Sequence, residues 1–102
     1  MSRITINAVA FRQDSLWIAQ CLEYNLVSCA ESLEDLPNAL LSQILDQIEA
    51  DTESGNEPFW AFKPAPQRYW EMFAQARASE PLRPRQTVPA VDAQLFPMPA
   101  AA

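Results

Sequence analysis

Histidine is absent from this 102-residue chain, glycine occurs once and cysteine twice. Without histidine the chain lacks the commonest metal ligand and the most frequent general base, which excludes Ser-His and Cys-His catalytic pairs. A single glycine cannot build the glycine-rich loops that hold nucleotide phosphates. Two cysteines are too few for a disulfide framework or, without histidine, for a four-ligand zinc site. The sequence therefore predicts a protein without catalytic activity, cofactor or metal.

Positive charge is also scarce, because seven Lys and Arg residues stand against thirteen Asp and Glu, for a formal net charge of -6. Direct nucleic-acid binding needs a basic surface and is not expected. No apolar run approaches the ~18 residues of a membrane-spanning helix, and none marks a leader at the N-terminus. We therefore expect a soluble cytoplasmic protein that binds neither nucleic acid nor membrane.

Charge and proline divide the chain unevenly. Residues 1–57 carry two basic and ten acidic side chains, a net charge of -8, whereas residues 58–102 carry five and three. Five of the nine prolines lie in the last 23 residues, a segment that is rich in alanine and shows no periodicity. We predict one domain over residues 1–79, followed by a disordered tail over residues 80–102.

Three segments near the N-terminus have the pattern of β-strands. Residues 3–11 alternate apolar and polar side chains up to a polar turn, and residues 16–22 are mostly apolar. The turn-tolerant Asn25 then separates them from a third extended segment, residues 26–30. With a short fourth strand over residues 59–63, these segments predict a three- to four-stranded antiparallel sheet and an α+β fold.

One long amphipathic helix follows these strands and is expected to cover one face of the sheet. Its apolar stripe comprises Leu33, Leu36, Leu40, Leu41, Ile44, Leu45 and Ile48. Ser32 and Asp35 form a capping box, but Pro37 would then interrupt the second turn, so the helix begins at either Ser32 or Asp35. It ends near residues 51–52, and Leu40, Ile44 and Ile48 are the predicted centre of the core.

Six of the ten aromatic residues lie between positions 59 and 73. A short helix that begins at Gln67 would place Tyr69, Trp70 and Phe73 on one face. This face can pack on the sheet or dock on a second subunit or partner, and both remain open. We expect a homodimer whose interface includes Tyr69, Trp70 or Phe73.

The two cysteines would lie opposite each other if the hairpin were centred on Asn25. A redox clip between Cys21 and Cys29 is then conceivable. We favour two reduced thiols that act as small apolar core residues, because no histidine or nearby lysine would activate them.

Several carboxylates share a face of the long helix, where Asp46, Glu49 and Glu53 are spaced i, i+3, i+7. Such a group can hold magnesium, but a solvated face opposite the apolar stripe is the favoured interpretation, and no metal is assigned. The acidic half of the chain would attract a basic partner. Glu49 on this helix and Glu23 on a hairpin turn are the predicted acidic contacts.

Two stretches resemble the HicB-like antitoxin family. Trp17, Ile18 and Ala19 occupy the places of its aromatic-aliphatic-Ala strand, and residues 32–35, Ser-Leu-Glu-Asp, those of its helix start, in a match over roughly residues 3–52. Residues 58–73 are similar to the C-terminal part of stand-alone HicB-like proteins that carry no second domain. The resemblance implies a partial ribonuclease-H-like fold without catalytic carboxylates.

The resemblance also implies a function, namely to cover a small basic ribonuclease toxin of the HicA kind. The sequence thus favours a non-catalytic, antitoxin-like interaction protein that binds a basic protein through acidic side chains. Two alternatives remain open: a degraded ribonuclease-H-like enzyme that uses acidic residues and magnesium, and a structural homodimer with no toxin partner.

Overall fold

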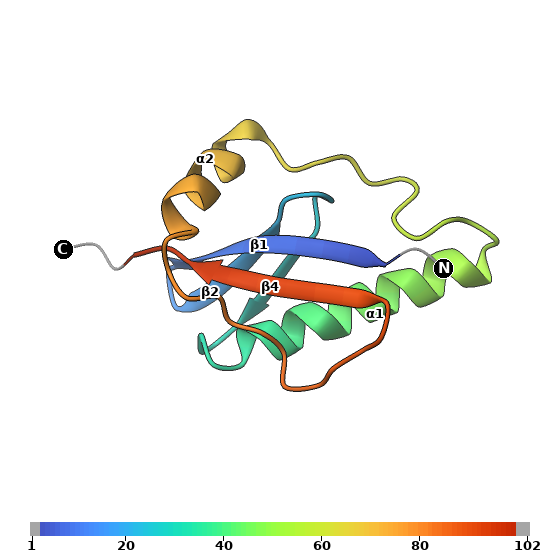
Figure 1. Cartoon of the computed structure of the whole chain (residues 1–102), viewed down its shortest axis with the longest axis horizontal. Helices are drawn as coiled ribbons and strands as arrows, with labels where there is room; N and C mark the ends of the chain where they lie inside the picture. The colour runs from blue at the N-terminus through green and yellow to red at the C-terminus, as the bar shows by residue number, and fades with distance from the viewer. Residues whose placement is uncertain (1–2, 100–102) are drawn as a thin grey trace.

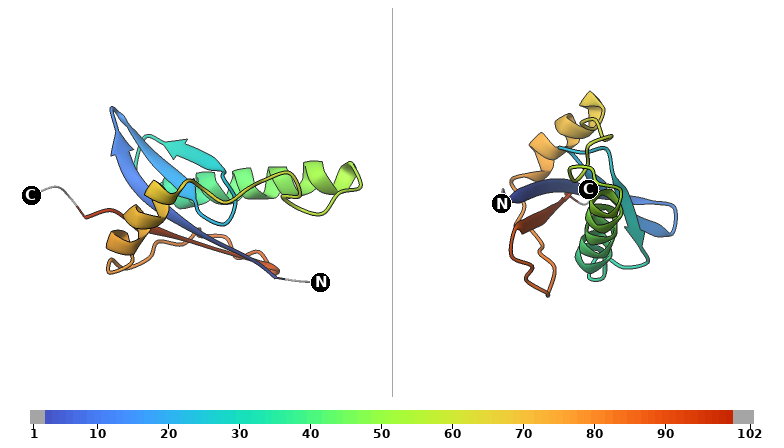
Figure 2. Two further views of the ribbon diagram at one scale, coloured as in Figure 1. Left: turned by 90° about the horizontal axis from the view of Figure 1, so that it is seen from above. Right: turned by 90° about the vertical axis from the view of Figure 1, so that its right-hand side faces the viewer.

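A mixed sheet with one helix on each face forms the described part of the chain, residues 3–99 of a computed structural model (Figures 1 and 2). Its elements in chain order are β1 (Ile4–Gln13), β2 (Leu16–Cys21), β3 (Val27–Ala30), α1 (Leu36–Glu53), α2 (Gln67–Ala76) and β4 (Val91–Pro97). The strand order is β3-β2-β1-β4. The predicted α+β class is confirmed. The sheet is not wholly antiparallel, however, because β4 pairs with β1 in parallel.

The first two hairpins follow the predicted strands closely. β1 and β2 are joined by a two-residue turn in which Asp14 has a positive φ of 56°, a conformation that aspartate tolerates better than most residues. The second hairpin closes where the Cys21 N–H donates to the Leu26 carbonyl (2.9 Å). This centre lies ahead of Asn25, so Ile18 and not Cys21 is opposite Cys29. The condition under which Cys21 and Cys29 would lie opposite each other is therefore not met.

α1 begins at Leu36, with Asp35 as its N-cap residue. Of the two predicted starts the later one is therefore correct, and it places Pro37 in the first turn, where a missing N–H costs no helical bond. Ser32 stabilises the preceding turn, because its hydroxyl accepts the Asp35 N–H (3.2 Å) and donates to the Asp35 carboxylate (2.9 Å).

The main core lies between α1 and the inner face of the sheet. Leu40 and Ile44 are buried as predicted, whereas Ile48 is only partly buried. The facing strand positions are mostly small, which lets the helix approach the sheet closely. These buried strand residues are Ile6, Ala8, Ala10, Ala19, Cys21, Ala93 and Leu95.

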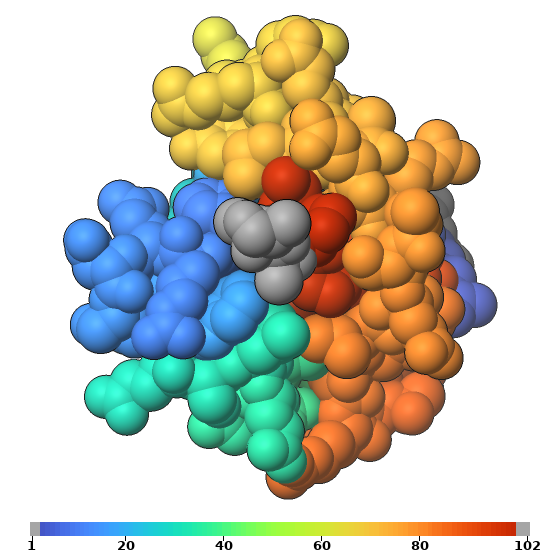
Figure 3. All heavy atoms as spheres, turned by 90° about the vertical axis from the view of Figure 1, so that its left-hand side faces the viewer, coloured from blue at the N-terminus to red at the C-terminus, as the bar shows by residue number. Residues whose placement is uncertain are grey.

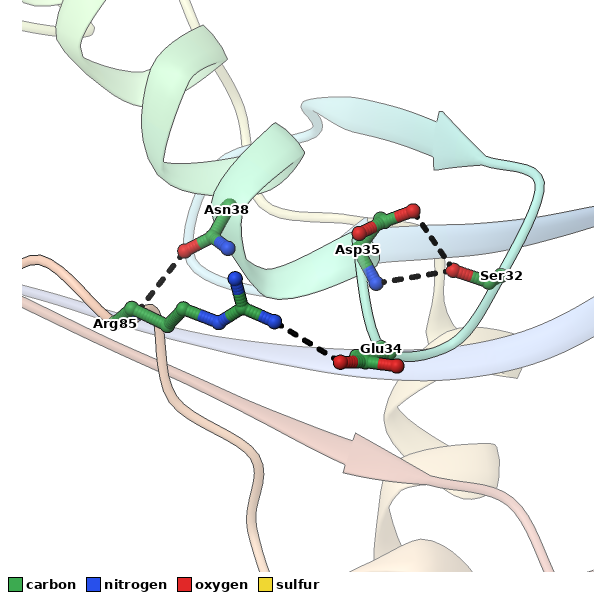
Figure 4. A network of polar contacts seen from close by, with 5 residues as sticks. All are labelled: Ser32, Glu34, Asp35, Asn38 and Arg85. Carbon is green, nitrogen blue, oxygen red and sulfur yellow. Dashed lines mark hydrogen bonds and ion pairs between the residues drawn. The ribbon is translucent and has the colours of Figure 1, made fainter.

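The C-terminal segment is part of the domain, so the predicted disordered tail is wrong for the described residues 80–99. β4 lies along β1 in register, and Leu82 exchanges backbone hydrogen bonds with Leu95 (2.7 and 2.9 Å). Arg85 ties the intervening loop to the start of α1: its N–H donates to the Asn38 side chain and its guanidinium pairs with Glu34, both at 2.9 Å (Figure 4). The apolar and polar side chains of residues 91–95 alternate, and this alternation is the sequence pattern that indicates the strand.

The predicted short strand at residues 59–63 is also wrong. These residues form turns, because Phe59 takes a positive φ of 62° that no strand residue adopts. The Phe59 ring is buried and stacks on Tyr24 with ring centroids 4.4 Å apart, and Phe62 meets it edge-on at 5.5 Å. The fourth strand of the sheet is supplied instead by residues 91–97.

We expect Ile44→Ala to destabilise the protein by about 2–5 kcal/mol, because it leaves a cavity at the centre of the α1–sheet core. Urea unfolding followed by circular dichroism measures this loss. The exposed neighbour Gln43→Ala is the matched control and should change stability little. Equal midpoints for both variants would contradict the assignment of the core.

Truncation after Ser79 should unfold the domain, because it removes β4 and exposes the edge of β1. The buried Leu95 leaves with that strand, and the backbone groups of β1 that pair with β4 are left without a partner. Far-ultraviolet circular dichroism and thermal denaturation of the truncated chain report the outcome. A cooperative transition like that of the full chain would show that the C-terminal segment is dispensable.

Candidate partner-binding surfaces

The aromatic side chains of α2 lie against the outer face of the sheet. Tyr69 stacks on Phe11 with centroids 6.2 Å apart, and Phe73 meets Phe96 edge-on at 5.2 Å. The Trp70 indole N–H donates to the carbonyl of Ala65 (3.1 Å). In the space-filling view of Figure 3, the region of α2 lies above the end of β4. Packing within the chain is thus shown for Tyr69, Trp70 and Phe73, while their part in an interface stays a prediction.

The large apolar side chains that remain exposed belong to other segments. Trp60 is 63% exposed in the turns before α2, and Val27 and Leu16 are 45% and 36% exposed on β3 and β2. Trp60 belongs to the aromatic cluster of residues 59–73, whereas no exposure was predicted for Val27 or Leu16. The exposure of Val27 and Leu16 marks the β2–β3 side of the outer face as an apolar surface that the chain itself does not cover.

A row of hydrogen-bonded polar side chains crosses the outer face beside α2. The Glu23 carboxylate accepts both the backbone N–H and the side-chain amide of Asn7, each at 2.8 Å. The Gln94 amide donates to the Asn7 side chain (3.2 Å), and Arg83 donates to Gln94 (3.0 Å) and pairs with Asp92 (3.2 Å). The row therefore links the end of β2 to β1, β4 and the segment outside β4.

Glu23 thus has a structural role, whether or not it also contacts a partner. Beyond the end of β2 the Asn7 N–H has no backbone acceptor, and the half-buried carboxylate of Glu23 accepts its hydrogen bond instead. Each carboxylate oxygen can still accept a further hydrogen bond, so an incoming cation could share it. The predicted binding role of Glu23 remains a prediction.

The exposed side of α1 carries uncompensated negative charge. Asp46, Glu49 and Glu53 are exposed and lie on the same side of the helix, which contains no basic residue. Within residues 3–99 the ion pairs are Arg83–Asp92 and Arg85–Glu34, so neither pair involves these acids. We call Asp46, Glu49 and Glu53 the acidic face of α1.

This acidic face is electrostatically unfavourable in the isolated chain. Asp46 and Glu49 are three residues apart and Glu49 and Glu53 four, spacings at which like charges repel on a helix. The face also approaches the C-terminal end of α1, where the helix dipole favours cations and the last turn has no basic side chain. A cation bound here would relieve both effects.

An open apolar cleft lies beside the acidic face. It separates the C-terminal half of α1 from the first residues of β1 and β4, which diverge from the helix in the left view of Figure 2. Its volume is about 960 Å³, and Ile4, Tyr24, Ile48 and Val91 contribute apolar side chains to its walls. A partner that contacts the acidic face can therefore bury apolar side chains next to it.

Asp51, which the sequence analysis did not single out, fastens the end of α1. Its buried carboxylate accepts the Phe59 N–H (2.7 Å) and the Gln47 amide (3.0 Å), so it holds the following loop against the helix. Asp51 is thus occupied within the chain. Among residues 3–99, no three Cys, Asp or Glu side chains gather closely enough to hold a metal ion.

The two thiols occupy different environments. Cys21 is buried, and burial together with the charge of Glu23 raises its pKa to about 12. Cys29 is exposed on the outer face of β3. The prediction of core thiols therefore holds for Cys21 alone.

No protein family, curated protein or solved structure matches this chain. None of the helices in the described region is both long enough and apolar enough to cross a membrane.

The raised pKa of Cys21 predicts a loss of stability at alkaline pH. The unfolded thiol ionises near its ordinary pKa of 9.0, whereas the folded thiol keeps its proton up to about pH 12. The contribution of the Cys21 thiol to the free energy of unfolding is therefore fully present below pH 9, and it decreases above pH 9 by about 1.4 kcal/mol per pH unit. Urea unfolding at pH 8 to 10.5 should show this slope in wild type and Cys29→Ala. It should be reduced in Cys21→Ala, and an unchanged slope there would contradict the assignment.

Proposed function

We propose that this chain is a non-catalytic, HicB-like interaction protein, with an antitoxin-like role, that binds a small basic protein through the acidic face of α1. The observation that carries the proposal is the cluster of Asp46, Glu49 and Glu53, three exposed carboxylates on a helix without a basic residue. The chain places this charge where it costs stability, and a cationic partner would offset that cost.

The neighbouring cleft supports the same proposal. Electrostatic attraction mainly accelerates association and orients the partner, while apolar burial stabilises the complex once it has formed. The acidic face and the cleft border the same part of α1, because Thr52 lines the cleft and lies three residues after Glu49, a spacing that makes the two side chains neighbours on the helix surface. A basic protein with a protruding apolar side chain would use both.

The order of the elements supports the resemblance to the HicB-like family. Three strands lead directly into the long helix, as the matching segments of residues 3–52 imply. Trp17 and Ala19 lie on the inner face of β2, and residues 32–35 form the turn that starts α1. The toxin-like character of the partner rests on the resemblance, whereas its positive charge rests on the acidic face.

Neutralising the acidic face should weaken binding without unfolding the protein. The variant combines Asp46→Asn, Glu49→Gln and Glu53→Gln, and the probe is the purified product of the neighbouring open reading frame. We expect at least about a tenfold loss of affinity at low salt by calorimetry, and steeper salt dependence for wild type than for the variant. The folded variant should be as stable as wild type or more so, because the like charges are gone.

A second triple variant provides the control. Asp14→Asn, Glu31→Gln and Glu71→Gln remove the same amount of charge from exposed positions outside the acidic face. This variant should bind nearly as well as wild type. Equal losses in both variants would indicate a non-specific effect of net charge, and a probe that is not basic or does not bind would contradict the proposal itself.

A further inference from the structure

The two edges of the sheet differ in how their backbone groups are used. At the β4 edge, Leu82 and Leu95 exchange two backbone hydrogen bonds, so an additional segment covers this strand. At the other edge, β3 is the outermost strand. Among residues 3–99, no backbone hydrogen bond joins β3 to a segment on its outer side.

The register shows which groups of β3 are free. In an antiparallel pair, alternate residues direct both their N–H and C=O groups toward the same neighbour. Because the Leu26 carbonyl accepts from Cys21 across the β2–β3 pair, Ser28 and Ala30 also face β2. Val27 and Cys29 therefore direct their backbone groups outward.

Apart from its length of only four residues, the open edge lacks the usual protection against pairing. Exposed edge strands in natural proteins commonly carry a charged side chain, a proline or a bulge. β3 has the sequence Val-Ser-Cys-Ala, which contains no charge and no proline. The side chains of Val27 and Cys29 are exposed, and the partly exposed Leu16 lies on the same face of the sheet.

We propose that a second copy of this chain pairs with β3 in antiparallel orientation, about a two-fold axis at Ser28. Val27 then lies opposite Cys29 of the partner subunit, and Cys29 lies opposite the partner's Val27. Each of these two pairs forms two backbone hydrogen bonds. The sheets of the two copies become one continuous sheet, and the exposed side chains of Val27 and Cys29 meet those of the other copy on its outer face.

The charges at this edge favour a second copy over a basic partner. In the proposed register Glu31 lies opposite the neutral Asn25 of the partner subunit, so the two copies set no like charges against each other at the strand. A basic strand would find no carboxylate within β3 itself. The acidic face of α1 attracts a different molecule, so this proposal does not depend on the proposed function.

Disulfide formation tests the register directly. The Val27→Cys variant places a new thiol opposite Cys29 of the partner subunit, at a spacing that a disulfide can bridge. Under mild oxidation we expect most of the protein to form a reducible covalent dimer. Wild type, and Val27→Cys combined with Cys29→Ser, should remain mainly uncrosslinked, because identical positions then lie diagonally across the two-fold axis. Equal crosslinking in all three proteins would overturn the proposed register.

Sedimentation velocity tests the backbone contacts themselves. Val27→Pro removes an outward N–H that makes no bond within the chain, so the fold tolerates it as edge strands do. By symmetry the dimer loses two hydrogen bonds, and we expect dimerisation to weaken by about tenfold or more. Val27→Thr keeps the N–H and should dimerise like wild type. A monomeric wild type at tens of micromolar, or a folded Val27→Pro variant that dimerises equally well, would overturn the proposal.

Discussion

The packing of α1 against the inner face of the sheet is the interaction on which the rest of the structure depends. The long aliphatic side chains come from the helix, and the facing positions on β1 and β2 are mainly alanine. Such a surface lets one helix approach closely, but it leaves little apolar area for a second helix. The outer face is therefore covered by another element, and α2 supplies that cover with Tyr69 and Phe73 against Phe11 and Phe96.

The packing of α1 on the inner face also explains where its exposed acidic side chains lie. Because one side of α1 packs against the core, Asp46, Glu49 and Glu53 lie on the opposite side, where no basic side chain of the helix balances them. The basic residues of the second half serve elsewhere: Arg85 pairs with Glu34 at the start of α1, and Arg83 pairs with Asp92 on β4. Three of the ten acidic side chains of residues 1–57 thus lie together on one surface.

The sequence predicted the elements that have strong local patterns. The alternation of residues 3–11 and the apolar stripe of α1 each identify their own element without knowledge of its neighbours. The register of the second hairpin could not be read this way, because its loop is held from outside: the Leu22 carbonyl accepts from Ala65 and the Asn25 N–H donates to the carbonyl of Lys63. β4 was not predicted, because the C-terminal segment contains five prolines, although polar and apolar side chains alternate from Asp92 to Leu95. For the surfaces, sequence placed Glu49 on the exposed helix face but could not show that Glu23 bonds Asn7.

The connection between α1 and β4 ties these features together. A tight hairpin joins only antiparallel strands. Because β4 runs parallel to β1, the chain must cross the sheet before it forms β4. That crossing carries the loop fastened by Asp51, then α2, then the segment around Leu82 that covers the β4 edge. The same connection therefore covers the outer face and protects one edge of the sheet. It contacts the β2–β3 loop through Phe59, which stacks on Tyr24, and through residues 63–65, and then passes on to β1 and β4. None of these contacts pairs with β3, which leaves β3 as the strand where a further chain can add.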